Sequence, residues 1–271
     1  MKSFIADKNG KLSKLALNNI QDLTYSSLMK SLRKKDVKVN GKRVSQDVSL
    51  SIGDKVDVFY DVKIIQMFET VYQDQNVLVI NKFSGFTSES VFEQVKKQFE
   101  GANFIHRLDR NTSGLMIFSL SNDATDELLK GFKKRTFDKI YTATVVGKMP
   151  KKQDVLTAYL VKDKDSALVK IYDKKVNGSV LIKTGYSVLE QRKDTSVVSV
   201  TLFTGKTHQI RAHLAHIGNP ILGDGKYGDF EMNNKYNIKS QLLSATKLTL
   251  NFDKQSPLYY LNGKTFSLQG E

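Results

Sequence analysis

Residues 104–115 constrain this chain more than any other stretch, because they join a loop crowded with charges to an apolar run typical of a buried strand. Asp109 lies between Arg107 and Arg110, and a Thr-Ser-Gly turn separates these residues from the apolar run 115–118. A carboxylate among so many donors is expected to stay ionised, since positive charge and hydrogen bonds stabilise its charged form. It can then act as a nucleophile. The structural alternative is a loop aspartate in an ion pair ahead of an ordinary strand.

A second polar stretch, residues 204–220, predicts a helix with a defined start and end. Thr207 can cap its start, an apolar stripe runs through positions 210, 214 and 217, and Gly218 stops it. At 100° per residue, Arg211 lies on the flank of that stripe near the start of the helix. We therefore expect Arg211 to point into a cleft.

The first sixty residues predict a small unit of two helices and a sheet. Residues 14–20 form one helix, and Thr24 caps a second that runs to position 35. An alternating segment broken by Asn40-Gly41 predicts a hairpin over 37–44, and 51–59 form a closing strand. On the second helix three cations at i, i+3 and i+4 share one basic face; they are Lys30, Arg33 and Lys34.

Beyond this unit, strands and helices alternate before an antiparallel meander. The predicted strands are 76–82, 115–120, 138–147, several short ones over 154–200, and 242–252. A helix begun by Ser88 or Ser90 precedes the Asp109 loop, and another begun by Asn122 or Asp123 follows the strand after it. In the 138–147 strand a tyrosine, Tyr141, is a core residue on pattern alone.

Net charge and cysteine usage narrow the class of function. Lys and Arg number 42 against 28 Asp and Glu, which gives a net charge of +14 and indicates a polyanionic partner, most commonly nucleic acid. The absence of cysteine excludes disulfides and thiolate metal sites and favours a reducing compartment. No apolar run approaches the ~18 residues that a membrane span needs. We expect a soluble, cytoplasmic protein that does not bind membranes.

All four histidines fall in the two polar stretches, which raises the possibility of a metal site. On a regular helix His208 and His213 project about 140° apart, so these two and His216 cannot converge on one ion. We expect no metal, and we interpret the histidines as hydrogen-bonding groups.

Three motifs resemble those of the RluA family of RNA pseudouridine synthases. His-Arg-Leu-Asp-x-x-Thr-Ser-Gly at 106–114 matches the first, Lys-x-Tyr-x-Ala at 139–143 the second, and Gly-x-Thr-His-Gln-Ile-Arg-x-His-Leu at 205–214 the third. The segment 219–228 continues the match, and the resemblance covers about residues 74 to 255. It departs at Phe83, where the family has proline, so we expect a less rigid loop there. Ser244 is a second, peripheral departure.

The resemblance implies an α+β class, with a mixed, largely antiparallel central sheet flanked by helices, and an activity. The reaction is the isomerisation of uridine in RNA to pseudouridine, without a cofactor. Asp109 would be the catalytic carboxylate, Arg211 would hold it, and Tyr141 would stack on the uracil and act as acid or base. The resemblance assigns five further residues to substrate binding, and they are His106, Arg107, Thr112, His208 and Gln209.

The N-terminal unit resembles the RNA-binding domain named after ribosomal small-subunit protein four, here called the S-four fold. We therefore predict an S-four-like domain over 1–62, whose Lys30, Arg33 and Lys34 bind RNA, and a catalytic domain over 63–271. This pairing favours ribosomal RNA of the large subunit as substrate, and we expect a monomer. The alternatives are a tRNA pseudouridine synthase, a non-catalytic RNA-binding or ribosome-assembly protein, and a hydrolase of nucleosides or glycosides.

Overall fold

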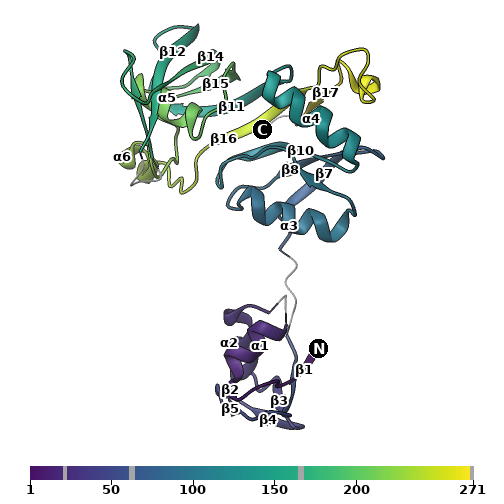
Figure 1. Ribbon diagram of the computed structural model, residues 1–271. Helices are drawn as coiled ribbons and strands as arrows, with labels where there is room; N and C mark the ends of the chain where they lie inside the picture. Colours follow the sequence, from purple (N-terminus) through teal and green to yellow (C-terminus); the bar gives the residue numbers. More distant parts are fainter. Residues whose placement is uncertain (21–22, 61–64, 164–167, 269–271) are drawn as a thin grey trace. The chain divides into compact units, whose positions relative to one another are not determined.

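The computed structural model describes residues 1–20, 23–60, 65–163 and 168–268, and the chain divides into two compact units, Met1–Ile65 and Gln66–Glu271 (Figure 1). The boundary predicted between positions 62 and 63 falls within 61–64, outside the described residues. No helix within the described ranges is long and apolar enough to cross a bilayer.

The first unit packs two helices on a four-stranded antiparallel sheet of order β1-β6-β3-β4. Its elements are β1 (Lys2–Ile5), β2 (Gly10–Lys11), α1 (Leu12–Asn19), α2 (Tyr25–Arg33), β3 (Val37–Val39), β4 (Lys42–Val44), β5 (Ser49–Leu50) and β6 (Lys55–Val58). Thr24 caps α2 by accepting from the Ser27 amide. Asn40 and Gly41 both have positive φ, 48° and 79°, as a tight hairpin requires. Both predictions are confirmed.

The second unit is built on a sheet of eleven strands among the described residues, with helices on its faces (Figure 1). Its strands are β7 (Phe68–Gln73), β8 (Val77–Lys82), β9 (Asn103–Phe104), β10 (Ser113–Ser119), β11 (Asp138–Val146), β12 (Gln153–Lys162), β13 (Val169–Tyr172), β14 (Val180–Gln191), β15 (Thr195–Leu202), β16 (Leu243–Thr249) and β17 (Thr265–Ser267). Its helices are α3 (Ser88–Gln98), α4 (Asn122–Lys134), α5 (Gln209–His216), α6 (Phe230–Lys235) and the 3-10 helix η1 (Tyr259–Leu261).

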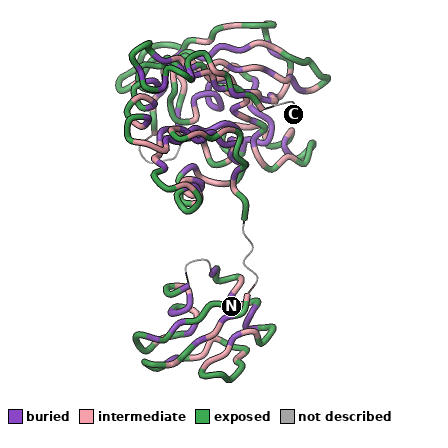
Figure 2. Tube along the Cα trace, turned by 90° about the vertical axis from the view of Figure 1, so that its right-hand side faces the viewer, coloured by how far each residue is buried: buried purple, intermediate pink, exposed green. Residues whose placement is uncertain are grey.

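The strand order is β13-β12-β14-β15-β11-β16-β10-β8-β7, and the pairing is antiparallel except between β10 and β16. The predicted α+β class, with a mixed, largely antiparallel sheet, is confirmed. Alternation along β8 places Leu78 and Ile80 in a core with α3, and Val77 and Val79 in a second core with α4. In Figure 2 the buried residues of this unit lie mainly along its inner segments, and its outer turns are mostly exposed.

Gly114 makes the parallel junction possible. Its φ is 111°, and a Cβ there would lie 2.4 Å from the backbone of Ala245, its pairing partner on β16. On its other side Ala245 pairs with Tyr141 of β11. Because only glycine fits this close approach, β16 can lie between β10, which follows the Asp109 loop, and β11, which carries Tyr141.

Three predicted helix starts are wrong, and in each case the nearest predicted residue lies one position from the observed cap. α3 is capped by Thr87, which accepts from the Ser90 amide, and α4 by Ser121, which accepts from the Ala124 amide. In both cases the hydroxyl sits on the last extended residue before the helix, where it reaches the free amides. α5 starts after His208, which has a φ of 53° and makes no side-chain cap, so Thr207 does not cap it.

Candidate active site

A cavity of about 450 Å³ lies where the Asp109 loop, β11 and the start of α5 meet. Its lining includes the three residues predicted to be catalytic, Asp109, Tyr141 and Arg211. Neighbouring positions predicted to bind substrate also reach it; they are His106, Arg107, Thr112, His208 and Gln209. Lys30, Arg33 and Lys34 belong to the first unit and line no part of this cavity.

The backbone around Asp109 is held on both sides by polar anchors. Ser88 Oγ donates to the Leu108 carbonyl at 2.8 Å and accepts from the Leu108 amide at 2.9 Å. Lys82 Nζ donates to the Arg110 carbonyl at 3.1 Å. Because the residues before and after it are fixed in this way, Asp109 occupies a defined position although it lies in a loop.

The two carboxylate oxygens of Asp109 have different surroundings. Oδ2 accepts from Nη1 of Arg211 at 2.8 Å and lies 3.9 Å from Nε2 of His208. Oδ1 receives no hydrogen bond from any residue in the described ranges. The side chain is 24 % exposed, so Oδ1 is accessible to a molecule in the cavity.

Arg211 divides its guanidinium between two carboxylates. Its Nε and Nη2 form a fork on Asp224, at 2.7 and 2.8 Å, and the remaining Nη1 reaches Asp109. Arg211 is 6 % exposed and Asp224 is 2 % exposed. Burial is the largest single influence and raises the pKa of Asp224. The hydrogen bonds and positive charge of Arg211, together with the backbone amides of Lys226 and Tyr227, outweigh it and hold the pKa below its usual value. The bidentate partner of Arg211 is therefore Asp224, and Asp109 accepts one N–H from Nη1, the nitrogen that the fork does not use.

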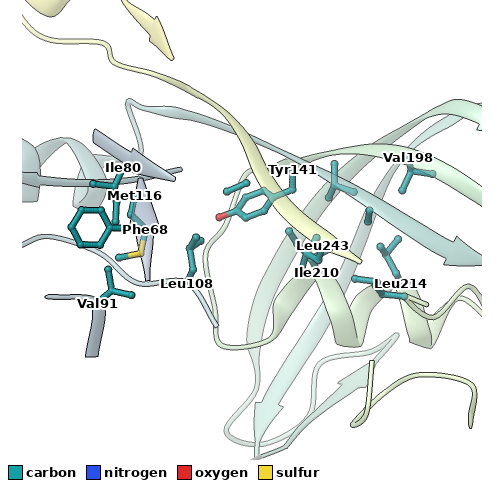
Figure 3. Close-up of a cluster of buried hydrophobic side chains, with 14 of the residues drawn as sticks. Phe68, Ile80, Val91, Leu108, Met116, Tyr141, Val198, Ile210, Leu214 and Leu243 are labelled. Carbon is teal, nitrogen blue, oxygen red and sulfur yellow. The ribbon is translucent and has the colours of Figure 1, made fainter. Parts of the chain in front are cut away.

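Tyr141 points its ring into the core at the cavity wall. Figure 3 shows it among the buried residues Leu108, Leu243 and Ile210, with its hydroxyl oxygen directed toward the Leu108 side. Burial, followed by the negative charge of Asp109, raises the pKa of the Tyr141 phenol above its ordinary value. The phenol therefore holds its proton at neutral pH and can donate it in a hydrogen bond.

The predicted substrate-binding residues differ in how free their polar atoms are. Thr112 is buried and accepts from the Gln241 amide at 2.7 Å. The buried amide of Gln209 donates to Thr184 Oγ1 at 2.9 Å and accepts from Thr204 Oγ1 at 2.9 Å. These two residues shape the wall with their polar atoms already engaged.

His106 is likewise engaged, whereas Arg107 faces outward. Nε2 of His106 accepts from the Ile117 amide at 3.1 Å, and its ring stacks on Phe132 at 4.3 Å. Burial lowers the pKa of His106 to about 3, so it is uncharged at neutral pH. The side chain of Arg107 is 69 % exposed and lies 3.2 Å from Glu89. Among the described residues, Arg107 is thus held by a surface ion pair with Glu89, which is readily exchanged for another anion.

Cations dominate the charge around the cavity. Its lining contains one carboxylate, Asp109, and five cationic side chains, which are Arg107, Arg135, Lys139, Lys206 and Arg211. Arg135 lies at the C-terminus of α4 in the left-handed conformation, with a φ of 59°. A polyanionic ligand fits this distribution of charge. In the described ranges no three His, Asp or Glu side chains converge as ligands for a metal ion.

Sequence reasoning missed Asp224, Tyr227 and Lys82 as residues of the site. Asp224 and Tyr227 lie in the 219–228 segment, which was identified only as an extension of the third motif. Tyr227 contacts two residues of the site. Its ring centroid is 5.3 Å from the Arg211 guanidinium carbon, and its hydroxyl oxygen lies 2.9 Å from Nδ1 of His208. The sequence signal that could have indicated Asp224 and Tyr227 was the group of polar residues in 219–228, a few positions after Arg211.

Lys82 is fully buried, and its ammonium group donates to three backbone carbonyls, those of Phe83, Phe86 and Arg110, at 2.9 to 3.1 Å. It joins the loop after β8 to the Asp109 loop. In the same loop the Phe83 amide donates to the Met67 carbonyl at 2.9 Å. Proline has no such donor, so the departure at Phe83 adds an anchor where we expected a loss of rigidity.

Lys82 makes the stability of the protein depend on pH. Burial lowers the pKa of its amine from 10.5 to about 8, whereas the nearby Asp109 raises it. Between pH 8 and 10.5 Lys82 therefore carries more protons in the unfolded chain than in the folded protein. The contribution of Lys82 to the unfolding free energy grows as the pH rises through this range, and it is lost as the pH falls to 8. We expect the unfolding free energy of wild type, relative to Lys82→Met, to increase over this range in urea titrations. Relative to the exposed-site variant Lys247→Met the difference should stay flat, because both proteins keep Lys82. A flat difference for Lys82→Met would contradict the assignment.

Comparison with known proteins matches this chain to one family. The family model described as RNA pseudouridylate synthase matches residues 76–216. The ribosomal large subunit pseudouridine synthase C of Vibrio cholerae is 30 % identical to this chain, and the alignment covers 78 % of this chain and 75 % of the relative. The ribosomal large subunit pseudouridine synthase C of Rickettsia bellii is 31 % identical, and the alignment covers 76 % of this chain and 79 % of the relative. The solved structure of human RNA pseudouridylate synthase domain containing 1 has the same fold, with a TM-score of 0.62 and 24 % identity over 75 % of this chain and 91 % of the human one.

The match spans the Asp109 loop, β11 and α5, whose residues line the cavity. The resemblance seen in the three motifs is thereby confirmed. The chain belongs to the RluA family of RNA pseudouridine synthases.

Proposed function

We propose that this enzyme converts specific uridines of large-subunit ribosomal RNA to pseudouridine, with Asp109 as the nucleophile. The observation that carries the proposal is the accessible Oδ1 of a carboxylate whose other oxygen is held by Arg211 in a cationic cavity. The relatives named as ribosomal large subunit pseudouridine synthases support the choice of RNA.

The chemistry follows from what the cavity offers. The bond from the anomeric carbon to ring nitrogen 1 must break, the uracil must turn, and carbon 5 must bond instead. Carbon 5 then loses its proton, and nitrogen 1 gains one. An ionised carboxylate can stabilise or trap an electron-poor anomeric carbon, as it does in retaining glycosidases. Asp109 supplies that carboxylate, and the Tyr141 phenol, whose pKa is raised by burial and by Asp109, stays protonated beside it. No cofactor is required, because the bonds broken and formed balance within the nucleotide.

The cavity walls suit a nucleotide taken out of its stack. A paired or stacked uridine has to be flipped before a protein side chain can reach its sugar or base. Arg107 and Arg135 line the cavity, and Arg107 is held only by its surface contact with Glu89. These side chains can contact the phosphates that flank the flipped nucleotide, and Arg107 can fill the gap that it leaves.

The test of this function is a chemical map of pseudouridine in total RNA from cells with and without the gene. We expect signal at one or a few positions of large-subunit ribosomal RNA to vanish in the deletion strain and to return with the wild-type gene. Complementation with Asp109→Asn should not restore it. Loss confined to tRNA would overturn the choice of substrate, and no loss in any RNA would favour a non-catalytic RNA-binding protein.

The first unit carries a basic depression of about 620 Å³, which we propose as a second contact with RNA. Its lining includes Ser26, Ser27, Phe59 and Tyr60. Its cationic residues are Lys30, Lys34, Lys35, Lys38 and Arg43, against one carboxylate, Asp36. Arg33, predicted to share the basic face with Lys30 and Lys34, is exposed on the same helix but does not line the depression.

Removing two of these cations should weaken RNA binding in a way that depends on salt. Each phosphate contact adds close to one unit to the slope of log affinity against log salt, so Lys30→Gln with Lys34→Gln should make the slope shallower by roughly 1.5. Filter binding from low to high salt measures it. The control, Lys8→Gln with Lys14→Gln, removes the same charge from exposed positions outside the depression. Equal slopes for the two double variants would show that the depression faces away from RNA.

A further inference from the structure

The proton arrangement around Tyr227 can be worked out from its hydrogen bonds. The Val169 amide donates to the phenol oxygen at 2.8 Å, so this contact uses an acceptor site of the oxygen. The same oxygen lies 2.9 Å from Nδ1 of His208. A phenol has one proton to donate. If Tyr227 gives that proton to Nδ1, every polar atom in this small chain of contacts is satisfied.

The opposite arrangement satisfies fewer groups. With the imidazole proton on Nδ1, Tyr227 would accept twice, and its own proton would have no partner among the described residues. The bare Nε2 would then face Oδ2 of Asp109, 3.9 Å away, and two groups with only lone pairs would oppose each other. With the proton on Nε2, the Tyr227 hydroxyl has an acceptor in Nδ1, and the lone pairs of Nε2 and Oδ2 no longer face each other. The Nε2–H then faces Oδ2 of Asp109, which already accepts from Arg211.

We infer that Tyr227 locks His208 in the tautomer with its proton on Nε2, so that His208 presents one N–H donor to the substrate beside Asp109. Two further features of His208 are consistent with this role. The backbone of His208 adopts the left-handed conformation, with a φ of 53°, which His tolerates better than most residues do. The pKa of His208 is lowered by burial, partly offset by Asp109, which keeps the ring uncharged.

The acceptor that suits this donor is an uncharged oxygen of the reacting nucleotide, on the uracil or on the ribose. His208 lines the cavity, and 3.9 Å between Nε2 and Oδ2 leaves the N–H without a short bond to Asp109. This part of the inference rests on the proposed function. The tautomer itself does not, since it follows from protein contacts alone.

The tautomer can be measured by long-range proton–nitrogen NMR on the full chain with labelled histidine. His106 gives an internal reference, because its Nε2 accepts from the Ile117 amide and its proton must therefore be on Nδ1. We expect His208, assigned from the signals lost in His208→Gln, to show the opposite pattern at neutral pH. A proton on Nδ1 or a doubly protonated ring would overturn the inference, whether or not the enzyme makes pseudouridine.

Kinetics then test the use of the donor. His208→Gln keeps an N–H donor close to the place of Nε2, whereas His208→Leu removes it, so His208→Leu should lose roughly tenfold more in kcat, the scale of one hydrogen bond. Equal losses would mean that His208 acts only by its shape.

Tyr227→Phe should yield a mixed tautomer at His208 and a lower kcat. An unchanged tautomer would overturn the role of Tyr227. The control, Tyr72→Phe, removes a hydroxyl bonded to Asp74 far from the cavity, and should retain the wild-type tautomer and kcat.

Discussion

Asp109→Asn is expected to reduce pseudouridine formation by roughly 10⁴-fold, the scale seen when a catalytic side chain is removed. The substitution keeps the size of the side chain and an oxygen for Arg211 Nη1 to bond, but it removes the negative charge that the mechanism requires. RNA affinity should remain close to wild type, because the lost charge is negative and the RNA is a polyanion. Single-turnover assays on a substrate fragment, together with binding measurements, separate the two effects.

The matched control is Asp154→Asn. Asp154 is also an ion-paired carboxylate, 2.8 Å from Lys151, but it lies on β12 outside the cavity. Its variant should turn over at the wild-type rate. Substantial turnover by Asp109→Asn would rule out Asp109 as the nucleophile. The rest of the site would then have to be assigned again.

Arg211→Lys is expected to reduce turnover by roughly a hundredfold, with a smaller effect on RNA binding. Lysine keeps the positive charge but cannot bond Asp224 through a planar fork and reach Asp109 with a third N–H. One of the two carboxylates then loses its donor in a buried site, and the orientation of Asp109 is lost with it. A hundredfold corresponds to about 2.7 kcal/mol of transition-state stabilisation.

Asp224→Asn provides the second half of this test. It leaves the arginine in place but removes the charge that fixes the fork, so we expect a loss of the same order as for Arg211→Lys. Arg192→Lys is the control, since Arg192 makes a comparable fork on Glu190 at the surface, at 2.8 and 2.9 Å. That variant should be active. If Arg211→Lys keeps near wild-type rates, Arg211 is only a structural residue.

Tyr227 and Lys82 show why parts of the site had no local signal. Lys82 ends a buried strand, and its role depends on three carbonyls, one of them 28 positions further along the chain. Tyr227 acts through an amide on β13 and a histidine that precedes α5. Each partner is supplied by a different element. A linear pattern cannot show which backbone groups a side chain will meet.

The sequence by itself determined the family, the α+β class, the hairpin at Asn40-Gly41 and the short set of residues to which the chemistry could belong. These depend on local patterns, since turn chemistry, strand alternation and motif spacing are set by neighbours along the chain. The tertiary structure alone decided which carboxylate receives the fork of Arg211, which oxygen of Asp109 stays free, and which groups face the two ring nitrogens of His208. These three features follow from the parallel pairing at Gly114 and from contacts between segments that are distant in sequence. The geometry of such contacts is fixed only when the whole sheet has formed.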